Sequence, residues 1–195
     1  ATGQMGLLRN LTSSEIFDQY AEVNRCCQER YGRKLSNIVF MGMGEPLLNY
    51  RQVVGAIRRL ISAKGPGLSP RRITVSTAGI AKMILRLADE NLKVNLALSL
   101  HAADDNKRST MMPINEHNDL QSLMSSLKYF NQKTGNKISY EYIAFAGFND
   151  QASDARSSLS GVNLDDEAAD LLRYQEAYNA AAKIIEIASK LFDTI

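Results

Sequence analysis

Polar residues follow the apolar runs of this chain, and the most distinctive group follows the run at residues 38–41. There Gly44 and Glu45 stand in the sequence GMGEP, inside the longer stretch NIVFMGMGEPLLN. Glycine lets a backbone approach a ligand where a Cβ atom would clash. A carboxylate held at the end of a strand suits an ammonium group. The alternative is a simple strand-to-helix turn with a solvated glutamate.

Two further apolar runs also end in polar residues. The run RITVS ends at Ser76, and the run VNLALSL passes through Ser99 to His101. If the strands are parallel, their carboxyl ends meet at one edge of the sheet, where barrel enzymes assemble sites from several strands. We therefore expect these side chains to lie beside Glu45. Taken alone, His101 fits a structural histidine equally well.

The hydrophobic pattern alternates between extended and helical segments. Thr12 and Glu15 have the spacing of a capping box, and Gly32 is placed to end the helix that they begin. The pattern predicts strands at 38–41, 72–76, 94–100 and 138–145, helices at 50–63, about 80–90 and 120–133, and a polar loop at 104–118. We expect the first strand to be buried on both faces, as in a parallel sheet. Strands that alternate with helices indicate an α/β fold, either a barrel or a doubly wound sheet.

Composition narrows the classes of function. The chain has 195 residues and a net charge of +2, so bulk charge indicates neither a nucleic-acid nor a membrane partner. No apolar run has the length of a membrane span. The two cysteines, Cys26 and Cys27, are adjacent, and two histidines, His101 and His117, are too few for a zinc site. We expect reduced thiols, a cytoplasmic location and an exposed His117.

Six motifs occur in a fixed order between residue 1 and about residue 155: ATGQMGLLRNLTSSEIFDQ, FMGMGEPLLNY, RRITVSTAG, LALSLHA, RSTMMPIN and YEYIAFAGFND. This part of the chain resembles the radical SAM methyltransferases that methylate the C2 carbon of adenine in ribosomal and transfer RNA. The resemblance implies a partial (β/α) barrel of about four parallel strands over residues 1–155. It also implies S-adenosylmethionine as cofactor and ribosomal and transfer RNA as partners.

The resemblance also implies which residues bind the cofactor. Gly44 and Glu45 correspond to residues that bind the amino group of S-adenosylmethionine. Ser76 and the segment Ser99, Leu100 and His101 correspond to the rest of that pocket. These are the strand ends that the pattern of polar residues singles out.

The chain departs from the family at the iron–sulfur site. In the family a CxxxCxxC motif, which holds a four-iron–four-sulfur cluster, lies immediately before the ATG with which this sequence begins. Three thiolates are needed, and the pair Cys26 and Cys27 matches none of them. The family's two catalytic cysteines also lie in segments not included here. We therefore expect an inactive fragment of the enzyme, with no catalytic and no metal-binding residues.

The last 40 residues, 156–195, change in character. They predict one long amphipathic helix that begins near Asn163 and carries a heptad seam. Its stripe includes Leu171, Tyr178, Ile185 and Phe192, which we expect to pack on the barrel or to mediate self-association. The segment resembles the C-terminal helix of flagellar hook-associated proteins, which implies assembly and export to the flagellum. A chimera of two unrelated proteins is the leading interpretation, and a natural fusion is the alternative.

Overall fold

The computed structural model describes residues 8–41, 44–102 and 104–150. The helix expected within 156–195 lies outside these residues. None of the described helices is long and apolar enough to cross a membrane.

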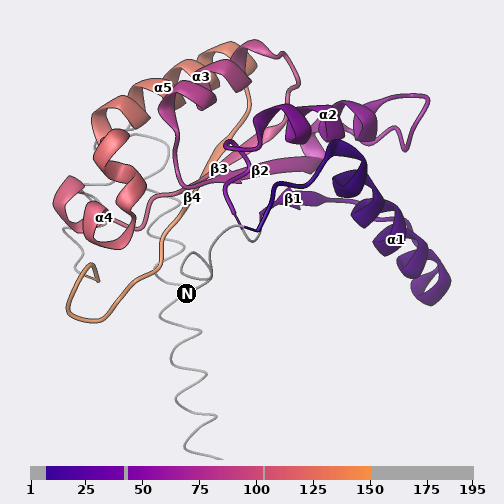
Figure 1. Cartoon of the computed structure of the whole chain (residues 1–195), viewed down its shortest axis with the longest axis horizontal. Helices are drawn as coiled ribbons and strands as arrows, with labels where there is room; N and C mark the ends of the chain where they lie inside the picture. The colour runs from indigo at the N-terminus through magenta and orange to yellow at the C-terminus, as the bar shows by residue number, and fades with distance from the viewer. Residues whose placement is uncertain (1–7, 42–43, 103, 151–195) are drawn as a thin grey trace, which may run out of the picture.

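Four parallel strands form a single sheet. They are β1 (Ile38–Phe40), β2 (Ile73–Thr77), β3 (Asn95–Ser99) and β4 (Ile138–Glu141), and they lie in the order β1-β2-β3-β4 (Figure 1). Each strand pairs with the next one in the chain, without the reversal of order that defines a doubly wound sheet. The α/β fold with about four parallel strands is confirmed, and its strand order is that of a barrel segment.

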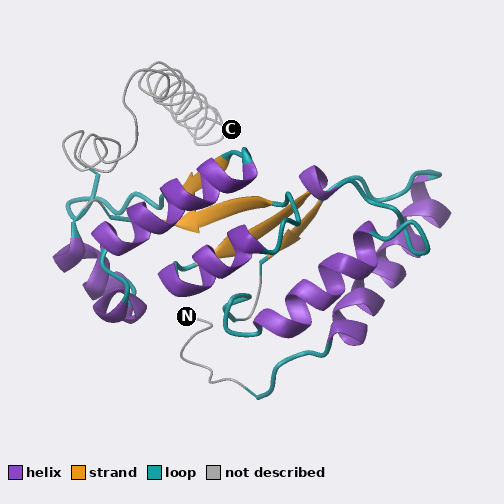
Figure 2. Ribbon diagram, turned by 90° about the horizontal axis from the view of Figure 1, so that it is seen from above, coloured by secondary structure: helices purple, strands orange, loops and turns teal. Residues whose placement is uncertain are grey.

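The helices α2 (Tyr50–Ile61), α3 (Ala81–Asp89) and α5 (Leu120–Thr134) cover one face of this sheet (Figures 1 and 2). The core lies between these two layers. Successive side chains of a strand point to opposite faces, so alternate residues of each strand enter it. The most deeply buried strand residues are Ile73, Val75, Leu96 and Leu98.

The same alternation places the polar strand residues on the other face. Ser76 follows the core residue Val75, and Ser99 follows the core residue Leu98. Parallel pairing sets Ser99 opposite Glu141 of β4. Three polar side chains therefore gather on the face that the helices leave uncovered, near the carboxyl ends of the strands.

Helix α1 (Ser13–Tyr31) begins and ends where the sequence predicts. The Thr12 side chain accepts from the Glu15 backbone, the Glu15 side chain accepts from the Thr12 backbone, and Gly32 closes the helix with φ 63°. None of the α1 residues is buried. The helix packs beside α2, where the Ser13 N–H donates to the Gln52 side chain at 2.8 Å.

The expectation that the first strand is buried on both faces is wrong. Strand β1 is at the edge of the described sheet and pairs only with β2, and Val39 keeps 52% of its surface exposed. A continuous apolar run suits a central strand, but the same run occurs here at an edge. The last predicted strand is also too long, since β4 ends at Glu141 and residues 142–145 lie outside it.

The predicted polar loop at 104–118 is largely helical. It contains α4 (Asp105–Met111) and the 3₁₀ helix η3 (Pro113–His117), with a shorter 3₁₀ helix, η2 (Pro70–Arg72), before β2. Asp104 caps α4 by accepting a hydrogen bond from the Lys107 N–H. The exposure of His117 is confirmed.

Candidate functional site

A carboxylate joins the serines of two strands on the sheet face opposite α2, α3 and α5, where Ser76 is buried. The Ser76 hydroxyl lies 3.3 and 3.4 Å from the two carboxylate oxygens of Glu141, and the Ser99 hydroxyl donates to Glu141 Oε2 at 3.1 Å. Both serines were predicted as site residues, whereas Glu141 was missed. Its signal in the sequence is a single charged residue inside the otherwise β-forming run ISYEYIAF.

Glu45 lies at the carboxyl end of β2 and is already held by three donors. Oε1 accepts from the Leu47 N–H at 2.9 Å and from the Thr77 hydroxyl at 2.8 Å, and Oε2 accepts from the Ala78 N–H at 2.7 Å. A carboxylate offers about four acceptor positions. These bonds fix its orientation and leave a position on Oε2 for a further donor, such as an ammonium group.

Gly44 is exposed beside this carboxylate. A Cβ atom added to Gly44 would meet nothing within 4 Å, so the space next to the backbone is open. The preceding residues 42 and 43 lie outside the described part of the chain.

Leu100 and His101 behave differently from each other. The Leu100 side chain is buried in the core below the helices, while its N–H donates to the backbone oxygen of Glu141 at 2.9 Å. Its side chain is therefore part of the core. Only its backbone lies at the strand end.

His101 has the left-handed backbone angle φ 58°. Its Nδ1 atom accepts a hydrogen bond from the Ile143 N–H at 3.2 Å, which assigns the remaining ring proton to Nε2. Burial lowers the pKa of His101 below its ordinary value, while the charge of Glu141 opposes this shift and that of Arg108 adds to it. The neutral ring thus presents an N–H donor at this edge of the sheet.

Arg108 connects the ends of β2 and β3 through hydrogen bonds to their backbone oxygens. Its side chain is fully buried and donates to the carbonyl oxygens of Ala78, Ser99 and Leu100 at 2.5 to 3.1 Å. It also donates to the Asn115 side chain at 2.5 Å. Burial lowers the pKa of Arg108 and the nearby charge of Asp105 raises it. One guanidinium therefore fixes the spacing between the ends of β2 and β3.

Asn149 fixes the segment that follows β4. Its side chain is buried, donates to the carbonyl oxygens of His101 at 2.6 Å and Ile143 at 2.9 Å, and accepts from the Phe145 N–H at 2.6 Å. Only its first residues, 142–145, were predicted as part of a strand. Those residues form no strand, and residues 146–149 form a turn whose Asn149 side chain bonds to His101.

The chain is similar to known proteins in sequence and in fold. A probable dual-specificity RNA methyltransferase RlmN from Cytophaga hutchinsonii is 53% identical over 156 residues, which are 80% of this chain and 43% of the relative. The corresponding protein of Salinibacter ruber is 50% identical over 159 residues. The crystal structure of a radical SAM methyltransferase from Sphaerobacter thermophilus matches with a TM-score of 0.79 and 39% identity, over 83% of this chain and 47% of that chain.

Residues 1 to about 155 are similar to radical SAM RNA methyltransferases. The chain spans less than half the length of these relatives. Membership of the radical SAM methyltransferases implies S-adenosylmethionine and an iron–sulfur cluster as the cofactors of these relatives. The polar strand ends described above lie within the similar region.

A radical SAM cluster does not fit the cysteines of this chain. Cys26 is exposed and Cys27 partly exposed on consecutive positions of α1, far in sequence from the polar strand ends. Among the described residues no three His, Cys, Asp or Glu side chains are grouped to hold a metal ion. The three thiolates that a cluster requires are thus not provided by these 195 residues.

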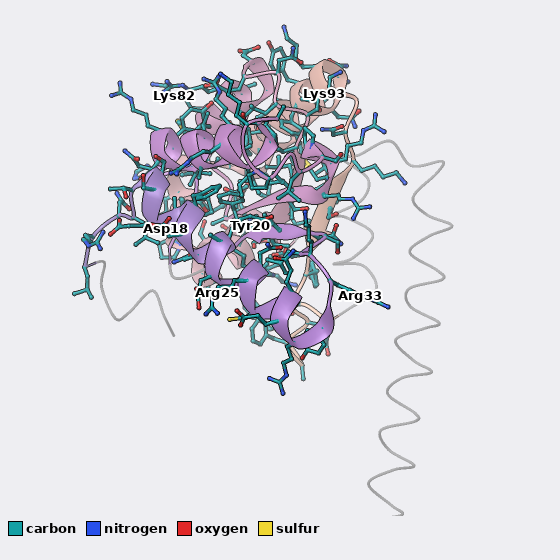
Figure 3. All side chains as sticks on the ribbon, turned by 90° about the vertical axis from the view of Figure 1, so that its right-hand side faces the viewer. Asp18, Tyr20, Arg25, Arg33, Lys82 and Lys93 are labelled. Atoms are coloured by element: carbon teal, nitrogen blue, oxygen red, sulfur yellow. The ribbon has the colours of Figure 1, made fainter. Side chains whose placement is uncertain are left out.

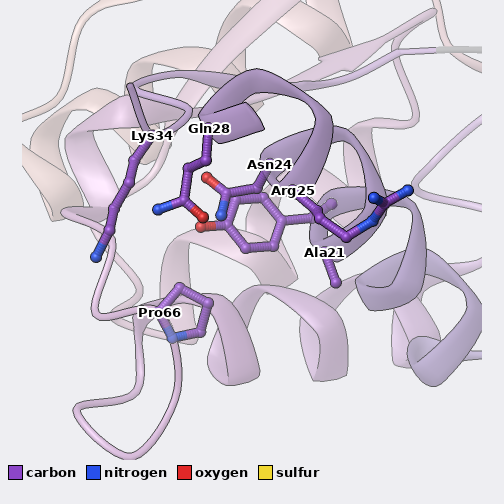
Figure 4. Close-up of a pocket in the computed structure, with 7 residues that line it drawn as sticks. Ala21, Asn24, Arg25, Gln28, Lys34 and Pro66 are labelled. Carbon is purple, nitrogen blue, oxygen red and sulfur yellow. The ribbon is translucent and has the colours of Figure 1, made fainter. Parts of the chain in front are cut away.

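A groove of about 330 Å³ lies elsewhere, between α1 and the loop that contains Pro66 (Figure 4). Besides Lys34 and Pro66, it is lined by five residues of α1: Tyr20, Ala21, Asn24, Arg25 and Gln28. None of the predicted site residues lines it. The groove is therefore separate from the radical SAM-like strand ends.

The C-terminal segment matches a different family. The model for the flagellar basal body rod FlgEFG protein C-terminal region matches residues 155–195. This confirms the resemblance of the tail to flagellar axial proteins, on residues that lie outside the described structure.

Proposed function

We propose that residues 1–155 bind S-adenosylmethionine at the carboxyl ends of the strands, as part of a methyltransferase for adenine C2 in ribosomal and transfer RNA. The observation that supports this most directly is the bridge from Glu141 to Ser76 and Ser99. Ser76 and Ser99, which the family resemblance implies as site residues, thereby both contact the carboxylate of Glu141, which the resemblance did not supply. RNA substrates also favour a cytoplasmic location.

The two carboxylates suit different parts of the cofactor. S-adenosylmethionine carries a positively charged amino group and a ribose with two neighbouring hydroxyls. Glu45 keeps an acceptor position for the ammonium group, and Glu141 with its two serines offers acceptors and donors for the ribose hydroxyls. His101 adds the Nε2–H donor, and Gly44 leaves room for the ligand beside the backbone.

S-adenosylmethionine supplies the methyl group and, in radical SAM chemistry, the radical. We propose that the 195 residues alone bind this cofactor without cleaving it, because they contain no cysteine set for the cluster. Anaerobic reconstitution with iron and sulfide should leave no cluster absorbance near 400 nm. A stoichiometric cluster would refute this part of the proposal.

Calorimetric titration with S-adenosylmethionine tests the pocket. We expect Glu45→Gln and Glu141→Gln each to weaken binding about tenfold or more, because a hydrogen bond to a charged group contributes about 1.5–3 kcal/mol. Glu116→Gln is the matched control, since Glu116 is exposed on η3. If the wild-type chain binds no more tightly than both site variants, the proposed pocket is wrong.

A second candidate function belongs to the tail, on the strength of the flagellar family match at residues 155–195. We propose that this segment mediates self-association through Leu171, Tyr178, Ile185 and Phe192, which recur every seven residues. Light scattering of the full chain should give a mass above the monomer. Replacement of all four by serine should restore the monomer mass, and identical masses for the two proteins would refute tail-driven assembly.

A further inference from the structure

Exposed basic residues precede every strand of the described sheet. They are Arg33 and Lys34 before β1, Arg71 and Arg72 before β2, Lys93 before β3 and Lys137 before β4. Because all four strands are parallel, these six residues lie at the amino edge of the sheet, opposite the candidate site. We call them the basic rim. Figure 3 looks toward this end of the molecule and labels Arg33 and Lys93.

Acidic residues near this edge are neutralised by other cations. Glu29 pairs with Arg25 at 2.6 Å, Glu90 with Arg58 at 2.5 Å, and Asp89 lies 3.6 Å from Lys133. Within the described part of the chain, no ion pair involves any of the six rim residues. The rim is therefore a local positive surface on a chain whose net charge is only +2.

The basic rim is not needed to neutralise the negative carboxyl ends of the helices. The helices end at the same edge, and their carboxyl ends favour nearby cations. Each helix already carries its own basic residues in the last turn: Arg30 in α1, Arg58 and Arg59 in α2, Arg86 in α3 and Lys133 in α5. The rim residues follow the ends of the α-helices and lie outside them, so their charge is additional.

An exposed aromatic ring stands next to the rim. Tyr31 is the last residue of α1, two positions before Arg33, and 66% of its surface is exposed. The Arg30 guanidinium lies 5.8 Å from the centre of its ring. Exposed aromatic rings combined with basic side chains are typical of surfaces that bind single-stranded nucleic acid, because bases stack on the rings while cations contact the phosphates.

We propose that the basic rim binds the phosphates of a single-stranded part of an RNA, with an unpaired base stacked on Tyr31. The inference rests on the proposed function, because the relatives named above are RNA methyltransferases. Strands of three to five residues are roughly 10–17 Å long, so the rim lies about that far from the candidate cofactor site. A large RNA can contact both edges of the sheet, and the rim then contributes affinity away from the target base.

Fluorescence anisotropy with a fluorescein-labelled, unstructured 20-nucleotide RNA tests the surface. The rim variant carries Arg33→Gln, Arg71→Gln and Lys93→Gln. The control variant carries Arg51→Gln, Lys82→Gln and Lys128→Gln, which remove the same charge from exposed positions on α2, α3 and α5. We expect the rim variant to bind at least tenfold more weakly than the control. Its slope of log affinity against log salt should fall by about 2, because each lost phosphate contact removes about 0.7.

Tyr31→Ala separates stacking from charge. We expect it to weaken binding about tenfold and to leave the salt dependence unchanged. Equal affinities and slopes for the rim and control variants would overturn the proposal, as would wild-type binding to phosphatidylserine vesicles but not to the RNA. The rim variant should still bind S-adenosylmethionine like the wild type. If the wild type does not bind that cofactor, the proposed pocket is wrong. The RNA affinities of the rim and control variants can still be compared in that case.

Discussion

At the residue scale, Arg108 connects the ends of two strands through one fully buried side chain. Arg108→Met keeps most of the volume but leaves the carbonyl oxygens of Ala78 and Ser99 without these donors. Buried acceptors that lose their partners cost about 1–3 kcal/mol each. We expect urea unfolding to show a loss of about 3 kcal/mol or more. Arg51→Met, on the exposed side of α2, should change stability by less than about 0.5 kcal/mol, and a similar small loss for Arg108→Met would contradict the bracing role.

His101 should make stability depend on pH. Its folded-state pKa is lowered, chiefly by burial, with Glu141 opposing and Arg108 adding to the shift. The unfolded chain therefore binds the proton more readily. The contribution of neutral His101 to the free energy of unfolding is complete above about pH 6.5. It is lost as the pH falls through the folded-state pKa. We expect the wild type to lose stability relative to His101→Asn as the pH falls below about 6.5; asparagine tolerates the left-handed backbone at this position.

The exposed histidine provides the control for this measurement. His117→Gln should follow the pH dependence of the wild-type free energy of unfolding, since His117 is exposed on η3. If His101→Asn and His117→Gln show the same curve as the wild type, the lowered pKa of His101 has no bearing on stability.

At the scale of elements, the turn from β2 to α3 requires a glycine. Gly79 has φ +101°, and a Cβ atom there would lie 2.9 Å from Leu123 and 3.0 Å from Leu98. We expect Gly79→Ala to cost about 3 kcal/mol, through backbone strain and crowding together. Gly67→Ala is the matched control: Gly67 has φ +66° but open space around it, so only strain of about 1 kcal/mol is expected. Equal losses in thermal unfolding would show that contact with α5 and β3 is not the cause.

The elements that the sequence predicted best carry local signals. The capping box at Thr12 and the left-handed Gly32 specify both ends of α1 without help from the rest of the fold. Helix α4 was read as loop because its seven residues are too few to show a helical period, and its Asp104 cap resembles a turn. The edge position of β1 was missed because an apolar run contains no information about the number of neighbouring strands.

The candidate site was only partly predictable for a similar reason. Ser76 and Ser99 follow apolar runs, so their gathering follows from parallel strands alone. Glu45 was expected beside them, but its carboxylate bonds to Thr77 and Ala78. The role of Glu141 depends on the register that sets it opposite Ser99, and the role of Arg108 depends on a helix that the pattern did not predict. Long-range pairing of this kind has no counterpart in a local pattern.

At the scale of the whole molecule, one sheet carries different chemistry at its two edges. The carboxyl edge presents Glu45, Glu141 and two serines, and the amino edge presents the basic rim. The same helices cover the sheet between them (Figure 1). This polarity suits a protein that binds a small cofactor at one edge and a phosphate-rich polymer at the other.

We propose that S-adenosylmethionine binds at the carboxyl edge of the sheet. Backbone amide NMR spectra of the full chain, recorded with and without the cofactor, test it most directly. We predict that the largest shift changes occur at Ala78, Ser99, His101 and Ile143, whose amides or side chains meet at this edge. Changes confined to Ala21, Asn24 and Gln28 in the α1 groove, or no change at saturating cofactor, would contradict it.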